Sequence, residues 1–212
     1  FHEFGHGLHG LLSDCTYEKL AGTNVARDFV ELPSQIMENW ALEPEVLKIY
    51  AKHFETGEPM PDELIEKIRN ARHFNQGFAT TEYLAASFLD MDWHTTTGIS
   101  SKIDVPRFER ESLEKIELIP EIISRYRSPY FRHIFAGGYS AGYYAYLWAE
   151  VLDADAFEAF KETGDIFDPK TAKAFRDNIL TQGGTVDPMT LYTRFRGQEP
   201  DTGALLKRRG LK

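Results

Sequence analysis

The sequence predicts a mainly α-helical fold with little or no β-structure. Apolar residues recur at helical spacing through most of the chain, for example at Val46, Leu47, Tyr50 and Phe54. No segment shows the strict alternation of apolar and polar residues that is typical of a half-buried strand. Apolar residues form 42% and aromatic residues 13% of the 212 positions, which is enough for a sizeable core. We therefore expect one compact helical unit.

Proline, glycine and the apolar spacing together indicate where each helix begins and ends. Pro33 and Pro44 suit first turns, because the ring fixes φ and no N–H donor is needed there. Gly57 suits a helix end. We expect a polar loop at 95–101 and mostly irregular structure at 125–138. The expected helices span residues 1–13, 28 or 33 to 41, 44–57, 62–73, 81–95, 105–118, 139–152, 154–163, 169–180, 188–195 and 202–208.

The composition excludes several classes of protein. The formal net charge is −9, whereas a nucleic-acid-binding protein needs a concentrated positive field. The sequence has no run of about 18 apolar residues, so we expect no membrane span. Cys15 is the single cysteine, which rules out an internal disulfide and fits a reducing compartment such as the cytoplasm.

The chain begins inside its most informative motif, at Phe1-His2-Glu3. We therefore expect residues 1–212 to be the C-terminal part of a catalytic domain whose N-terminal lobe is missing. On this interpretation the chain alone is weakly active or inactive, because half of the substrate cleft is absent. A targeting signal would lie at the true N-terminus, so a periplasmic or exported location is the alternative to the cytoplasm.

Residues 2–6 read His-Glu-x-x-His, which is the strongest functional signal in the chain. Residues four apart lie on one face of a helix, so His2 and His6 can bind one metal ion together. Glu3 is the next residue round the helix, close enough to contact a water molecule on that metal. This pattern is typical of zinc peptidases, with two ligands and a general base. The alternative is an ordinary amphipathic helix.

A catalytic zinc site takes three protein ligands, so one ligand remains to be found. The metzincin pattern needs glycine at position 9 and histidine at position 12, but the chain has His9 and Leu12. His9 lies seven residues beyond His2, about 10.5 Å along the helix axis, which is too far for a shared ion. A glutamate on a second helix is the other solution, and we favour the first of Glu31, Glu38, Glu43 and Glu45. Asp28 or Glu38 could hydrogen-bond a ligating imidazole.

The chain resembles the thimet-oligopeptidase family of zinc metallopeptidases over its whole length. The likeness depends on the motif at residues 2–6, on Gly22-Thr23, on Arg27–Glu31 and on residues 133–148, which read HIFAGGYSAGYYAYLW. Within the family it is most similar to the bacterial peptidyl-dipeptidase (dipeptidyl carboxypeptidase) branch, with the bacterial oligopeptidase A branch next. The resemblance implies a helical zincin-type lobe in which His2, His6 and Glu31 bind one Zn²⁺ and Glu3 is the catalytic base.

The same resemblance identifies residues 133–148 as a glycine- and tyrosine-rich substrate loop followed by a helix. A tyrosine hydroxyl can donate to an oxyanion without carrying charge, so we favour Tyr146 as that donor, with Tyr139 assisting. Gly137 and Gly138 would let the loop approach the substrate. Tyr143 would contact the substrate and His133 would hydrogen-bond it. The alternative for each side chain is a structural role, with the tyrosines as a packed stripe.

The sequence therefore predicts zinc-dependent hydrolysis of oligopeptides with release of C-terminal dipeptides. One alternative is endopeptidase cleavage of short peptides, as in the oligopeptidase A branch. Another is a non-catalytic peptide-binding protein with a structural zinc, against which Glu3 argues because a structural site needs no base. Arg125, Arg127 and Arg132 could hold a substrate carboxylate, or could pair with local acids.

Overall fold

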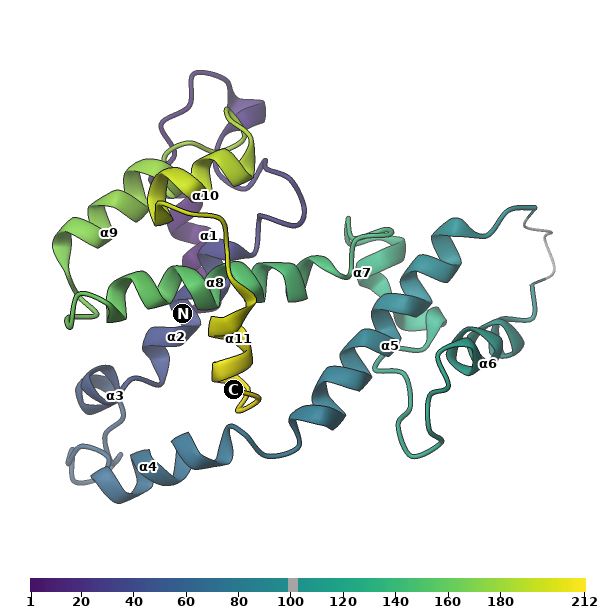
Figure 1. Ribbon diagram of the computed structural model, residues 1–212, viewed down its shortest axis with the longest axis horizontal. Coiled ribbons are helices and arrows are strands. Elements are labelled where there is room, and N and C mark those ends of the chain that lie inside the picture. The colour runs from purple at the N-terminus through teal and green to yellow at the C-terminus, as the bar shows by residue number, and fades with distance from the viewer. Residues whose placement is uncertain (99–102) are drawn as a thin grey trace. The chain divides into compact units, whose positions relative to one another are not determined.

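The computed structural model describes residues 1–98 and 103–212 (Figure 1). In these ranges the chain forms helices joined by turns, and its extended pairing is limited to an isolated antiparallel bridge between Lys52 and Pro59. The prediction of a mainly α fold is confirmed. Within the same ranges, no helix combines the length and apolar character needed to cross a bilayer. Part of the polar loop expected at 95–101 lies outside the described residues.

The chain divides into two compact units where the sequence predicted one. Unit 1 comprises residues 1–74 and 147–212, and unit 2 comprises residues 75–146. Each unit has its own cluster of buried apolar side chains. The sequence indicates the apolar faces of the helices, but not which faces pair, so it cannot reveal this division.

Unit 1 has a core in which helices from both ends of the chain meet. Trp40 packs edge-on against Phe157 and Phe160, with ring centroids 4.6 and 4.8 Å away. The ion pair between buried Asp153 and half-buried Arg208, 2.6 Å apart, attaches the last helix to the core. Its helices are α1 (His2–Leu11), η1 (Glu18–Leu20), α2 (Leu32–Ala41), α3 (Pro44–Tyr50), α4 (Asp62–Ala71), most of α8 (Ala145–Lys161), α9 (Pro169–Phe175), the π-helical turn η3 (Arg176–Leu180), α10 (Pro188–Arg196) and α11 (Thr202–Arg208).

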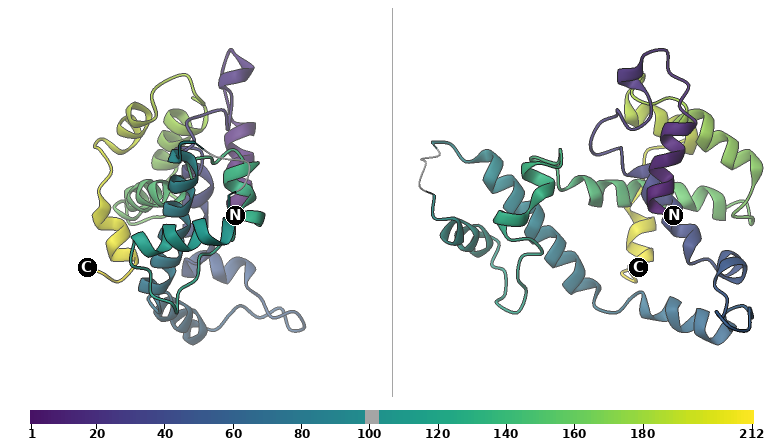
Figure 2. Two further views of the ribbon diagram at one scale, coloured as in Figure 1. Left: turned by 90° about the vertical axis from the view of Figure 1, so that its right-hand side faces the viewer. Right: turned by 180° about the vertical axis from the view of Figure 1, so that it is seen from behind.

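Helices α1 and α2 pack closely, and Gly5 permits this approach. A Cβ atom at Gly5 would lie 2.3 Å from the carbonyl oxygen of Pro33 and 2.5 Å from the Cα atom of Ser34. Glycine is therefore required at this point of α1 for steric reasons. The rear view in Figure 2 shows α1 in purple with the N-terminus at its lower end. The close packing brings the first turns of α1 beside the start of α2.

Unit 2 has an aromatic core. Its helices are α5 (Gln76–Thr95), α6 (Val105–Lys115), η2 (Ser128–Tyr130) and α7 (Arg132–Phe135), followed by turns that lead to the start of α8. Trp93 stacks on Phe108 with a centroid distance of 3.9 Å, which joins α5 to α6. The buried members of the core are Ala86, Phe131, Ile134 and Tyr143, and Tyr83, Trp93, Tyr126 and Tyr146 pack against them.

Several helix boundaries differ from the sequence prediction. Helix α8 begins at Ala145 rather than at Tyr139, because Gly138 and Ala141 have φ angles of +81° and +50°, which interrupt a right-handed helix. The same helix continues to Lys161 as one element, so the break predicted near residue 153 is wrong. Helix α5 starts five residues early, and α7 forms within a segment that was expected to be irregular.

Candidate active site

Two consecutive turns of α1 present His2 and His6 on one face of the helix. Their ring centroids are 5.1 Å apart and the rings are nearly perpendicular. Glu31 is the N-cap residue of α2, where the positive end of the helix dipole favours a carboxylate. Its side chain is only 3% exposed, and it lies among the buried apolar residues Val30 and Leu32. A carboxylate in such surroundings needs positive charge or hydrogen-bond donors.

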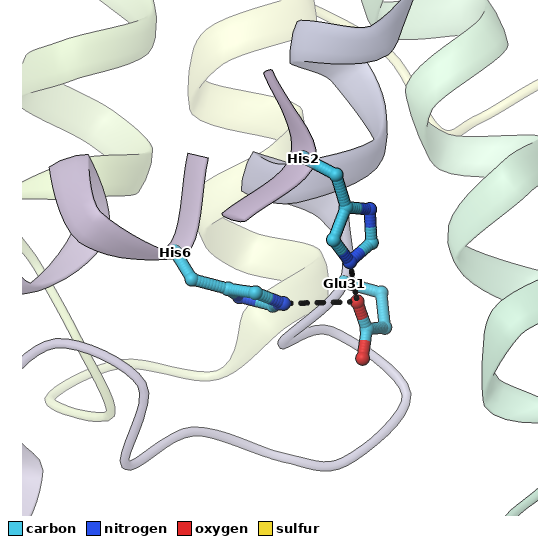
Figure 3. Close-up of side chains that lie close together, drawn as sticks. All are labelled: His2, His6 and Glu31. Atoms are coloured by element: carbon cyan, nitrogen blue, oxygen red, sulfur yellow. Dashed lines mark ion pairs between the residues drawn. The ribbon is translucent and has the colours of Figure 1, made fainter. Parts of the chain in front are cut away.

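The Glu31 carboxylate meets both imidazoles, as Figure 3 shows. Its Oε2 atom lies 3.5 Å from Nε2 of His2 and 3.2 Å from Nε2 of His6. Two ligand atoms bound to a tetrahedral zinc at about 2.05 Å are separated by about 3.3 Å. Both observed distances are close to this value. Among the described residues, the group of side chains that could hold a metal ion consists of His2, His6 and Glu31.

Neighbouring polar groups fix the orientation of these ligands. The Ser34 hydroxyl, which is fully buried, lies 2.9 Å from Oε2 of Glu31 and donates to this carboxylate. Oε1 of Glu38 lies 2.6 Å from Nδ1 of His2. A proton on Nδ1 leaves Nε2 of His2 with a free lone pair directed toward Glu31. This arrangement of carboxylate, imidazole and ligand atom is common around protein-bound zinc.

The electrostatics of the cluster also suit a cation. The hydrogen bond to Glu31 raises the pKa of His6, and this effect outweighs the opposing effect of burial. The protein thus attracts a proton to the place where a metal cation would bind. A divalent ion would displace that proton, because imidazole binds metals only in its neutral form. Donor atoms, spacing and charge therefore all fit a zinc ion.

The other residues of the motif helix differ in their exposure. Glu3 is exposed on α1, so solvent reaches its carboxylate. His9 is fully buried and, within the described part of the chain, neither ring nitrogen has a hydrogen-bond partner. Burial lowers the pKa of His9 to about 4, so its ring is neutral at physiological pH. His9 lies outside the cluster of possible metal ligands.

In unit 2 the residues predicted to form a substrate loop lie mostly in turns before α8. The Tyr139 ring stacks on the Tyr146 ring with a centroid distance of 4.9 Å. The His133 ring lies roughly perpendicular to both tyrosine rings, with a centroid distance of 6.3 Å to each. Tyr143 is only 4% exposed and belongs to the aromatic core. The structure therefore groups His133, Tyr139 and Tyr146, but not as one face of a single helix.

Glycines 137 and 138 shape the start of this loop. A Cβ atom at Gly137 would lie 2.8 Å from the Cα atom of His133, and Gly138 has a φ angle of +81°. Both positions therefore favour glycine for reasons of backbone geometry.

Arg127, one of the three arginines that could hold a substrate carboxylate, forms an ion pair with the buried Glu109 at 2.7 Å. For this arginine, the structure supports pairing with a local acid.

Two residues that matter for the metal cluster were not found from the sequence. Gly5 sets the distance between α1 and α2, and the only sequence signal is a glycine inside a helix, where it is otherwise unfavourable. Ser34 orients Glu31, and a serine three residues beyond a candidate ligand gives too weak a signal to identify. Glu38 was expected near an imidazole, and it contacts His2.

The chain is thus a mainly helical protein whose His-Glu-x-x-His helix packs against a glutamate on a second helix. It belongs to peptidase family M3, whose model matches residues 1–211. The chain is 48% identical over 212 residues to a dipeptidyl carboxypeptidase of Salmonella typhimurium, covering 100% of this chain and 31% of that protein. It is 44% identical over 214 residues to oligopeptidase A of Escherichia coli, again covering 100% of this chain and 31% of the relative. The chain therefore spans about a third of the length of these relatives.

Proposed function

We propose that this chain carries the metal centre of a zinc-dependent peptidase that hydrolyses oligopeptides and releases C-terminal dipeptides. The observation that carries the proposal is the cluster of His2, His6 and Glu31 beside the exposed Glu3. Membership of peptidase family M3 supports peptide hydrolysis. The 48% identity to a dipeptidyl carboxypeptidase supports the release of dipeptides. Each chain would hold one zinc ion.

The three motif residues His2, Glu3 and His6 and the further ligand Glu31 would divide the chemistry between them. When bound, zinc polarises the scissile carbonyl and lowers the pKa of a coordinated water to about 7. Glu3 takes a proton from the attacking water and passes it to the leaving amine. Glu38 would keep the His2 ring in its orientation and tautomer, and the Ser34 hydroxyl would fix the orientation of the Glu31 carboxylate.

The loop in unit 2 would act on the substrate. We propose that the Tyr146 hydroxyl donates to the carbonyl oxygen as negative charge develops on it. Tyr139 and His133 would assist by hydrogen-bonding the peptide, and Gly137 and Gly138 would let the loop backbone approach it. Tyr143, which is buried, would contact substrate through a small part of its surface. These roles rest on the likeness of residues 133–148 to the family's substrate loop.

Replacing Glu3 by Gln in the whole natural protein tests the mechanism. Glutamine has nearly the same shape but cannot accept the proton, so turnover of an oligopeptide should fall by at least about 100-fold. The zinc content, measured by atomic absorption, should stay at one ion per chain. Unchanged turnover would refute Glu3 as the base. Absence of turnover in the unaltered protein with zinc bound would favour the non-catalytic peptide-binding alternative.

A second candidate is endopeptidase cleavage of short peptides, which the 44% identity to oligopeptidase A favours. The two activities differ in their need for a free C-terminal carboxylate. A matched pair of peptides, one with a free acid and one with an amidated C-terminus, separates them. Dipeptide release predicts that the free acid is cleaved much faster, with the last peptide bond but one as the cleavage site. Equal rates would support endopeptidase cleavage instead.

A further inference from the structure

Asp90 is a buried carboxylate that neither the metal cluster nor the substrate loop includes. It lies on α5 and is fully buried. In the described part of the chain, no lysine or arginine forms an ion pair with it, and the nearest ring nitrogen is Nδ1 of His94, 2.8 Å from Oδ1. A buried carboxylate without a strong cation must be stabilised by hydrogen-bond donors. The donors in this case come from the backbone of the tyrosine-rich loop.

Both carboxylate oxygens of Asp90 accept hydrogen bonds from that loop. The N–H of Ala141 lies 2.9 Å from Oδ1, and the N–H of Tyr143 lies 2.8 Å from Oδ2. Backbone N–H groups of a turn that point to the same side can hold an anion between them. In this protein the anion is a side chain, so the loop backbone closes around Asp90. Nδ1 of His94 also lies 2.8 Å from Oδ1, and 2.9 Å from the backbone carbonyl oxygen of Asp90 one turn earlier on α5.

The loop needs this support because its backbone is strained. Ala141 has a φ angle of +50°, a left-handed conformation that costs free energy in any residue with a Cβ atom. Such a conformation persists only where the surroundings determine it. Within the loop, Ser140 donates to the carbonyl of Ile134 at 2.6 Å, and Gly142 donates to that of Tyr139 at 2.9 Å. Of the acceptors in these four hydrogen bonds, Asp90 is the only side chain, and it comes from a different helix, α5.

The strained turn separates the two stacked tyrosines. Tyr139 precedes it and Tyr146 follows it, and their rings stack at 4.9 Å and 17°. The position of one ring relative to the other therefore depends on the conformation of residues 140–145. We propose that Asp90 is a positioning residue that fixes the Tyr139–Tyr146 pair for its work on the substrate. This inference rests on the proposed peptidase function and adds a residue to it. Asp90 itself is too deeply buried to touch the substrate.

Replacing Asp90 by Asn is the first test. Asparagine keeps the shape of the side chain but turns one acceptor into a donor, which faces the N–H of Ala141 or Tyr143. With the proposed peptidase assay, kcat should fall by about 10-fold or more while KM changes by less than about 3-fold. The matched control is Glu109→Gln, because Glu109 is also buried in unit 2 and accepts from the backbone N–H of Ser128 at 2.5 Å, in a different turn. Equal losses of kcat in the two variants would overturn the proposal.

A double-mutant cycle separates positioning from general destabilisation. If Asp90 acts through Tyr146, Asp90→Asn should lower kcat by less than about 2-fold when Tyr146→Phe is already present. Multiplicative losses would show that Asp90 acts independently, which overturns the proposal. Should Asp90→Asn fail to fold, Asp90→Ser, which keeps a small hydrogen-bond acceptor at this position, enters the same cycle with the same two outcomes.

Hydrogen exchange provides a readout that does not depend on peptidase activity. The amides of Ala141 and Tyr143 should be protected in the unaltered protein and should exchange at least about 10-fold faster in Asp90→Asn. Protection of α6 (Val105–Lys115) should stay the same. Unchanged exchange at the two amides would refute the positioning role. If the unaltered protein shows no peptidase activity, the proposed function fails, but the exchange experiment still tests the contact between Asp90 and the loop.

Discussion

Replacing Gly5 by Ala gives a direct test of how the metal cluster is built. The added methyl group would lie 2.3 Å from the carbonyl oxygen of Pro33 and 2.5 Å from the Cα atom of Ser34. Both contacts are with backbone atoms, which cannot rotate away as a side chain can. Non-bonded carbon and oxygen atoms need about 3.3 Å, so α1 and α2 must separate locally by about 1 Å.

That separation is large compared with the tolerance of a metal site. His2 and His6 lie on α1 on either side of Gly5, whereas Glu31 belongs to α2. The ligand distances of 3.5 and 3.2 Å to Glu31 would grow by a similar amount, while zinc sites tolerate about 0.2 Å. We expect Glu31 to leave the coordination sphere and the Kd for zinc to rise at least about 100-fold, which is about 2.7 kcal/mol.

The assay is a competition titration of zinc between the protein and a chromophoric chelator, supported by thermal unfolding. Gly10→Ala is the matched control, because Gly10 lies in the same helix and an added Cβ there meets nothing within 4 Å. That control should keep its affinity and gain about 0.5–1 kcal/mol in stability from the better helix propensity of alanine. If Gly5→Ala binds zinc as tightly as Gly10→Ala, the close packing of α1 on α2 does not determine the metal cluster.

Two further predictions concern the surroundings of the metal ligands. Glu38→Gln should raise the Kd for zinc by about 10-fold in the same titration, because a neutral amide is a weaker hydrogen-bond partner for Nδ1 of His2. An unchanged Kd would mean that this exposed contact does not support His2 as a ligand. The pKa of His9 is lowered to about 4, so the unfolded chain binds more protons than the folded chain between about pH 6.5 and pH 4. The free energy of unfolding of the metal-free protein should therefore fall by about 3 kcal/mol as the pH drops through this window. Urea denaturation of metal-free His9→Leu should not show this loss. Parallel pH profiles of the two proteins would contradict the role given to His9.

The sequence predicted well the features that depend on local chemistry. Proline in the first turn marks the starts of α2 and α3, and the range of α11, Thr202–Arg208, was predicted without error. The spacing of His2 and His6 depends only on the helical repeat. Glu31 could be ranked above other glutamates because a charge among apolar residues needs a partner, and the structure places it beside both imidazoles.

The features that the sequence did not reveal depend on contacts between distant residues. The start of α8 at Ala145 follows from positive φ angles at Gly138 and Ala141, and alanine gives no sign of such a conformation. The bond of Asp90 to the N–H of Tyr143 joins residues 53 positions apart, and no local pattern encodes it. The division into two units likewise depends on which buried faces pair.

The proposed mechanism assigns roles to residues of both units. Because the metal ligands and the tyrosine pair belong to different units, each group can be tested by itself. The metal ligands lie in unit 1, so zinc titrations of Gly5 and Glu38 variants report on that unit alone. The Tyr139–Tyr146 pair lies in unit 2, so hydrogen exchange in Asp90 variants reports on that unit alone. On the proposed mechanism, peptide turnover depends on residues of both units. A variant that retains zinc and loop protection but loses turnover would therefore have a defect in the chemical step, as we expect for Glu3→Gln.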